Sequence, residues 1–227
     1  TMPSHAIGEI ESILDQEPML LDGWSSLGLA NMMTGDLDAA LRAYTYAVKL
    51  APMDVLTNNN QLVALRALGR HEEVSQKAQE LMKHYPMDTR WVRLAVNANA
   101  TLERTNEVYR LATLGLEQDA RDPYLLYMLG LAEIQRSNFR LAVSALDAAV
   151  KNDTRALDIQ MWIGHANQAL GEVDQAVKAY SAAAKDNPSD IRPVVAAGLL
   201  LAEEDRCDEA SSFLHHAVVG RGVAAES

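Results

Sequence analysis

The sequence repeats itself with a step of 34 residues, and this period constrains the fold more than any other feature of the chain. Glycine recurs at one phase of the step, at Gly28, Gly130, Gly164 and Gly198. Alanine recurs at a second phase, at Ala6, Ala40, Ala142, Ala176 and Ala210. Proline recurs at a third phase, at Pro18, Pro52, Pro86 and Pro188. A fixed step of this length is typical of proteins in which each repeat is one supersecondary element stacked on its neighbours.

The period predicts the domain organisation directly. Six units of equal length follow one another without insertion or deletion: 21–54, 55–88, 89–122, 123–156, 157–190 and 191–224. Residues 1–20 fit the second half of a preceding unit, and residues 225–227 form a short tail. We therefore predict one array over residues 1–224, because stacked repeats share a continuous core.

Each unit is predicted to contain two helices. In the first unit, Trp24, Leu27 and Asn31 share one face of a helix, and Gly35 suits its C-terminal cap. A second amphipathic stretch follows and is stopped by Pro52. The recurring glycine, eighth in the unit, is expected to let the two helices approach closely. The fold class that follows is all-α.

The recurring residues resemble the signature of the tetratricopeptide repeat (TPR). The resemblance is carried by Trp24-x-x-Leu27-Gly28, by Ala40 and Tyr44 with Ala47, and by Pro52. The unit 157–190 is similar, whereas 55–88 and 89–122 keep little beyond Gly69, Pro86 and the length. The resemblance implies a right-handed solenoid of stacked antiparallel helix pairs, and a role in binding other proteins.

The first helix of each unit offers a candidate binding surface. Positions two, five, nine, twelve and thirteen of a unit form one stripe on the helix, here named the first-helix stripe. The resemblance implies that this stripe lines a concave groove in which a peptide or helix lies. The candidate partner-binding residues on it are Arg66, Arg90, Arg93, Asn97, Tyr124, Tyr127, Leu131, Ile134, Met161 and His165. Exposed apolar side chains there would mark an interaction site. The alternative explanation is that the arginines are solvated and that the tyrosines pack between repeats.

The charge distribution favours the middle of the chain as the place where a partner binds. The formal net charge is −11, yet residues 55–122 hold nine acidic and nine basic side chains. Arg66, Arg90 and Arg93 of this neutral region lie on the first-helix stripe. A partner with a carboxylate would be steered there, so charge reversal at Arg90 and Arg93 should weaken binding.

Several other classes of function are not supported by the sequence. An excess of acids argues against nucleic-acid binding, and no apolar run is long enough to insert into a membrane. We find no phosphate-binding glycine loop, no catalytic constellation, no metal-binding motif and no cofactor motif, so the chain is predicted not to be an enzyme. Cys207 is interpreted as a free structural thiol. Asn31, Asn99 and Asn167 are interpreted as residues that hydrogen-bond between helices.

The predicted function is a non-enzymatic scaffold or adaptor that binds a protein or peptide partner in the groove. One alternative is a structural protein that self-assembles into homo-oligomers, because both ends of the array look uncapped. Another, by analogy with TPR proteins of this size, is an assembly factor for a bacterial secretion, pilus or envelope complex. A cytoplasmic location is favoured, with a periplasmic one if an upstream signal was removed.

Overall fold

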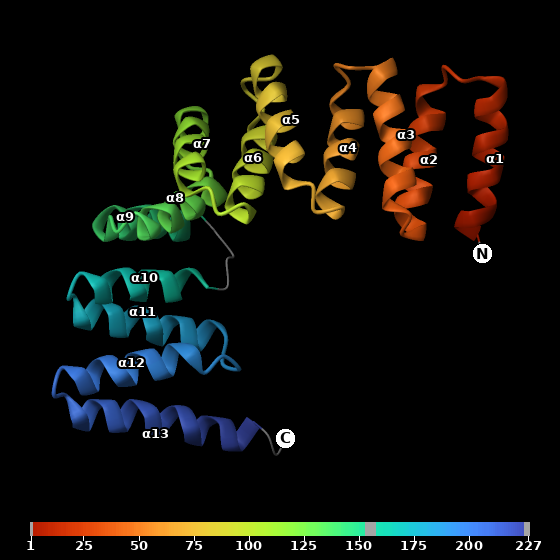
Figure 1. The fold of residues 1–227 in the computed structure, drawn as a ribbon. Coiled ribbons are helices and arrows are strands. Elements are labelled where there is room, and N and C mark those ends of the chain that lie inside the picture. Colours follow the sequence, from red (N-terminus) through yellow and green to blue (C-terminus); the bar gives the residue numbers. More distant parts are fainter. Residues whose placement is uncertain (1, 153–157, 225–227) are drawn as a thin grey trace. The chain divides into compact units, whose positions relative to one another are not determined.

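All regular secondary structure in the described residues is helical, as the sequence predicts. The computed structural model describes residues 2–152 and 158–224, with side chains for 5–152 and 158–215. The helices in this part of the chain are α1 (Met2–Gln16), α2 (Leu21–Thr34), α3 (Leu37–Leu50), α4 (Val55–Ala67), α5 (His71–His84), α6 (Thr89–Thr101), α7 (Thr105–Gln118), α8 (Pro123–Gln135), α9 (Phe139–Lys151), α10 (Ile159–Ala169), α11 (Val173–Asp186), α12 (Arg192–Glu203) and α13 (Cys207–Ala224) (Figure 1).

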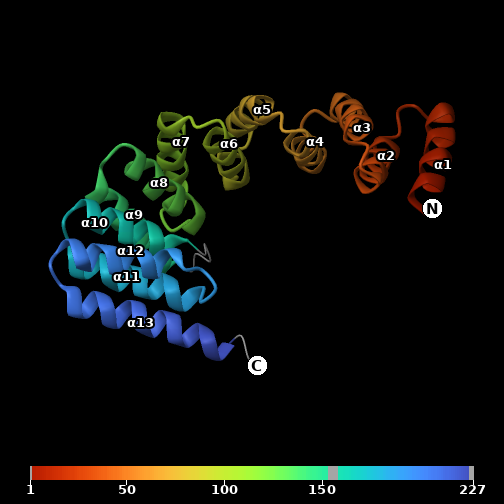
Figure 2. The same cartoon turned by 60° about the horizontal axis from the view of Figure 1, so that its bottom comes forward.

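The helices form two compact units, which are described separately. The first unit spans Thr1–Glu103 and contains α1 to α6, and the second spans Arg104–Ser227 and contains α7 to α13. Within each unit every helix packs against the next one along the chain. Figures 1 and 2 both show this arrangement for α10, α11, α12 and α13, which lie side by side. The division falls inside the predicted repeat 89–122, so a single array across it stays a prediction.

The helix ends follow the repeat. Each predicted 34-residue repeat contains two helices, and α1 forms the half repeat at the start of the chain. The fifteenth residue of every 34-residue repeat has a positive φ. These residues are Gly35, Gly69, Glu103, Ser137, Gly171 and Asp205. Glycine adopts this left-handed conformation without strain, but the other residue types do so at a cost. The turn is therefore imposed by the packing of the two helices it joins, even where glycine is absent.

The recurring glycine at position eight of the repeat allows the two helices to approach closely, as predicted. A Cβ atom added to Gly130 of α8 would lie 2.6 Å from the Cγ atom of Leu146 in α9. Gly28 and Gly198 face Tyr44 and Leu214 in the same way, with added Cβ atoms 2.4 and 2.7 Å from the nearest side-chain atom. Since real Cβ atoms do not approach other atoms so closely, a larger residue here would push the helix pair apart.

The prediction for the three asparagines is correct for only one of them. The side-chain amide of Asn99 in α6 donates to the hydroxyl of Ser75 in α5, at 2.7 Å. Asn31 and Asn167 instead donate to the carbonyl oxygens of Leu27 and Ile163 in their own helices. A side chain on the packing face reaches a neighbouring helix only where that helix offers a polar partner, and Ser75 is such a partner.

Candidate functional site

The predicted binding residues are divided between the two units. Four of them, Arg66, Arg90, Arg93 and Asn97, belong to α4 and α6 of the first unit and are exposed. The others belong to α8 and α10 of the second unit, where His165 is exposed and Tyr124, Tyr127, Leu131, Ile134 and Met161 are half-buried. The predicted binding residues therefore form two sets, one in each compact unit.

In the first unit, Arg90 is held by a neighbouring carboxylate. Asp88 caps α6 by accepting from the backbone N–H of Arg90 at 3.1 Å, and its carboxylate also accepts from the Arg90 guanidinium at 2.6 Å. These hydrogen bonds lower the pKa of Asp88. The guanidinium carbon of Arg90 also lies 5.5 Å from the ring centroid of Trp91. Arg90 is thus less available to a partner carboxylate than the sequence suggested, because a charge that is already paired gains less from a second anion.

In the second unit, Tyr127 is part of a hydrogen-bonded link between two repeats. Its hydroxyl donates to Asp158 at 2.8 Å, and the indole N–H of Trp162 donates to the other carboxylate oxygen at 2.9 Å. Burial, followed by the hydrogen bond to Asp158, raises the pKa of Tyr127. Tyr127 and Ile134 also pack against the core residues Leu126 and Ile159. Tyr127 therefore takes part in packing between repeats, which is the alternative explanation given for the tyrosines.

His165 sits on a polar and aromatic cluster. Its Nδ1 atom lies 3.2 Å from the hydroxyl of Tyr180, which donates to Gln168 at 2.7 Å. Its ring also contacts Trp162, with centroids 5.7 Å apart. Burial lowers the pKa of His165, so the neutral imidazole is favoured at neutral pH. Because His165 is exposed, this neutral imidazole lies at the surface of the second unit.

Exposed apolar side chains that are not among the candidate residues also lie on the same stripe. Leu199 in α12 is 60% exposed and Val195 is 39% exposed. In the first unit, Leu29 and Met33 in α2 are 57% and 70% exposed, and Leu56 in α4 is 65% exposed. All five occupy stripe positions two, five, nine or thirteen of their repeats. The repeat register could have found them, because it assigns each of them to the first-helix stripe.

The described residues contain neither a metal-binding cluster nor a spanning helix. No group of three or more His, Cys, Asp or Glu side chains among them could hold a metal ion. No helix in the described part of the chain is long and apolar enough to cross a membrane. Cys207 is a free thiol at the start of α13 and is exposed.

Comparison with protein families identifies the class to which the chain belongs. A tetratricopeptide repeat model matches residues 6–73 and 127–191, which together are more than half of the chain. The chain is therefore a member of the tetratricopeptide repeat family, as the resemblance in the sequence predicts. No curated protein sequence matches the chain.

Solved structures share the fold at low sequence identity. A tetratricopeptide repeat protein from Parabacteroides merdae matches with a TM-score of 0.70 at 14% identity, covering 88% of this chain and 79% of its own. YrrB, described as a TPR protein with an unusual peptide-binding site, matches with a TM-score of 0.67 at 20% identity, covering 79% and 92%. A chain of the APC/C hetero-tetramer Cut9–Hcn1 matches with a TM-score of 0.62 at 15% identity. This last match covers 92% of our chain, which spans only 42% of the matched one.

Proposed function

We propose that the protein is a non-enzymatic scaffold that binds a partner peptide or helix along the first-helix stripe of its repeats. Membership of the family and the nature of the related structures support a general protein-binding role. The finer proposal rests on one observation, the exposure of apolar side chains on this stripe within each unit: Leu29, Met33 and Leu56 in the first, and Val195 and Leu199 in the second. Large apolar side chains gathered on one surface are typical of interaction sites.

Each unit would contribute its own contacts. In the second unit, Leu131, Met161, Val195 and Leu199 would receive apolar side chains of the partner, with His165 as a polar contact beside them. In the first unit, Leu29, Met33 and Leu56 would do the same, and Arg66, Arg93 and Asn97 would supply hydrogen-bond donors. Tyr124 and Tyr127 would support the surface from below, because both are half-buried.

Site-specific photo-crosslinking tests this proposal. A photo-reactive amino acid is placed at Leu199 of the stripe in the full chain, and in a second preparation at Leu141 of α9. Leu141 is a matched control, since it is 58% exposed but lies on a second helix. We expect Leu199 to capture one protein repeatedly from a lysate of the source cell and Leu141 not to capture it.

A variant then distinguishes contact from chance proximity. Leu199→Glu places a charge in the apolar surface, and we expect it to reduce binding of the captured protein about tenfold or more, because a buried unpaired charge is costly. Leu141→Glu should leave the affinity unchanged. Charge reversal of Arg93 should also weaken binding if the partner contacts the first unit. Equal affinity of all three variants and the wild type would refute the proposal.

A further inference from the structure

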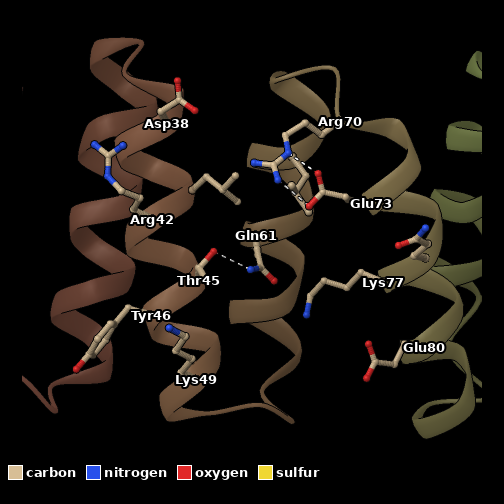
Figure 3. A pocket seen from close by; sticks show the side chains of 13 residues that line it. Asp38, Arg42, Thr45, Tyr46, Lys49, Gln61, Arg70, Glu73, Lys77 and Glu80 are labelled. Carbon is tan, nitrogen blue, oxygen red and sulfur yellow. Dashed lines mark hydrogen bonds and ion pairs between the residues drawn. The ribbon is translucent and has the colours of Figure 1, made fainter.

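A pocket lies in the first unit on the side of the helices away from the first-helix stripe. Its volume is about 690 Å³, its walls are α3 and α5, and its floor is formed by Gln61 and Leu65 of α4 (Figure 3). Successive helical residues are about 100° apart, so both floor residues lie roughly 160° around α4 from Val63 of the stripe. This space, here named the α3–α5 pocket, is thus separate from the surface proposed above.

The floor of the pocket contains a buried hydrogen-bond acceptor without a donor. Gln61 is only 8% exposed, and its amide N–H donates to the hydroxyl of Thr45 at 2.9 Å. Its Oε1 atom is buried and accepts no hydrogen bond from any described residue. Figure 3 shows Gln61 reaching from α4 into the space between the two walls. A buried acceptor left without a donor costs about 1–3 kcal/mol, so its presence beside a cavity indicates that a ligand supplies the donor.

The repeat shows that this glutamine is unusual. The seventh position of the other repeats is occupied by apolar residues: Leu27, Ala95, Leu129, Ile163 and Ala197. This position faces the core, where leucine would pack without the cost of an unpaired oxygen. The polar residue at position 61 is therefore not required by the repeat fold.

Three further cations belong to the lining of the pocket. Arg42 and Lys49 of α3 and Lys77 of α5 line the pocket, and within the described part of the chain none of them forms an ion pair. Burial lowers the pKa of Lys77, partly offset by Glu80, so an anion in the pocket would stabilise its charged form.

The acidic residues of the lining offset this charge only in part. Asp38, Glu73 and Glu80 also line the pocket, but Glu73 is held by Arg70 at 2.7 Å. Four cationic and three acidic side chains thus line the pocket, an excess of one positive charge in a protein whose net charge is −11. The pocket is therefore suited to a negatively charged group rather than to a positive one.

A second pocket adjoins the first one and shares two of its residues. Its lining is mixed, because Glu11, Asn31, Thr34 and Asp36 belong to it as well as apolar side chains. It lies between α1, α2 and α3, has a volume of about 670 Å³, and is lined by Ile7, Trp24 and Leu27 among others. Arg42 and Tyr46 line both pockets, and the ring centroids of Trp24 and Tyr46 lie 4.3 Å apart. A ligand with an acidic group next to an apolar one would fill both pockets.

We propose that the α3–α5 pocket binds an extended acidic segment of a partner protein. An aspartate or glutamate side chain of that segment lies among Arg42, Lys49 and Lys77, and a backbone N–H donates to Oε1 of Gln61. A neighbouring apolar side chain enters the pocket lined by Trp24. A peptide fits these requirements because it carries backbone donors, carboxylates and apolar groups within a few ångströms of one another.

Fluorescence polarisation with the full chain tests this proposal. The probe is a fluorescein-labelled peptide in which leucine and glutamate alternate, compared with peptides in which glutamine or lysine replaces every glutamate. We expect the glutamate peptide alone to bind. The double variant Lys49→Gln/Lys77→Gln should weaken binding about tenfold or more, since charge-assisted hydrogen bonds contribute roughly 1.5–3 kcal/mol. The matched control is Lys178→Gln/Lys185→Gln, which removes the same charge from exposed sites of α11.

A second variant separates recognition from folding. Gln61→Leu introduces the residue that other repeats carry at this position, so it should fold and melt at the same or a higher temperature. It should also weaken binding of the peptide about threefold to tenfold, because one hydrogen bond is lost. Leu199→Glu, on the first-helix stripe, should leave binding of this peptide unchanged.

Four results would overturn the proposal. They are no binding by the wild type, equal binding of the glutamine peptide, equal weakening by the α11 control, and displacement of the peptide by equimolar inorganic phosphate. The last result would assign the cations to a small anion. None of these results bears on the first-helix stripe, which is tested through Leu199.

Discussion

The ring of Tyr180 in α11 lies directly over Gly164 in α10, where a Cβ atom would be 2.4 Å from the Cε1 atom of the tyrosine. Tyr180 is fully buried, and its hydroxyl is held by Gln168. The two residues are eighth and twenty-fourth in their repeat. In the repeat 55–88 the same positions carry Leu62 and Ala78, both fully buried. The large and small residues have thus changed places between these two repeats.

We expect Gly164→Ala to lower the free energy of unfolding. Overpacking against a buried ring costs about 1–3 kcal/mol, which outweighs the roughly 1 kcal/mol that alanine gains over glycine inside a helix. Chemical denaturation followed by circular dichroism measures the change. Gly8→Ala is the matched control, because Gly8 lies in α1 with nothing within 4 Å of its added Cβ atom. It should be neutral or stabilising by up to about 1 kcal/mol.

Because the large and small residues can change places, the effect of Gly164→Leu on stability should change sign when Tyr180 is replaced by alanine. Gly164→Leu should destabilise the wild type, but it should stabilise the Tyr180→Ala variant by filling the cavity left by the ring. The four proteins of this cycle can be compared by the same denaturation experiment. If leucine has the same effect in both backgrounds, the two side chains do not share one volume.

Ser137→Gly should stabilise the protein. Ser137 has a φ of 60°, whereas Gly171 has a φ of 73° at the same position of the next repeat. Relief of the left-handed strain should raise the free energy of unfolding by about 1 kcal/mol. The reverse change, Gly171→Ser, should lower it by a similar amount. Equal stability of both variants and the wild type would show that the turns carry no strain.

Stability is expected to fall in alkaline solution, partly because of Tyr180. Burial raises the pKa of Tyr180 to about 12, above the ordinary value of about 10. Between these values the unfolded chain releases the proton while the folded chain keeps it. The contribution of Tyr180 to the free energy of unfolding is therefore complete below about pH 10. It declines as the pH rises towards 12, by at most about 1.4 kcal/mol per pH unit. Tyr180→Phe should flatten this decline, and parallel pH profiles of the two proteins would contradict the assignment.

Asp158→Ala should destabilise the second unit. It removes the acceptor of both the Tyr127 hydroxyl and the Trp162 indole N–H, which are part-buried. A loss of about 1–3 kcal/mol is expected from the donors left unsatisfied. Asp174→Ala is the control, since the Asp174 side chain is 83% exposed. If Tyr127 acts only as a partner contact, Asp158→Ala will leave the thermal midpoint unchanged.

The sequence could assign residues to one face of a helix, but it could not predict the contacts of single side chains. The repeat register alone assigns Leu199 and Leu29 to the same stripe as His165. It could not show that Asp88 holds Arg90 or that Asp158 holds Tyr127, because each pairing depends on the rotamers of two side chains. The α3–α5 pocket was also missed, since Lys77 comes from a different helix than Arg42 and Gln61 occupies a position that normally belongs to the core.

The 34-residue period by itself determined the helical fold class, the ends of the helices and the residues that share a face, because these follow from local geometry and from one repeated packing contact. Only the tertiary structure decided which of those residues remain available to a partner. Whether Tyr127 is exposed, whether Arg90 is paired and whether Oε1 of Gln61 finds a donor all depend on side chains from other helices. The period determines which side chains share a face, but it does not determine their residue types. Those residue types and their contacts determine what each surface can bind.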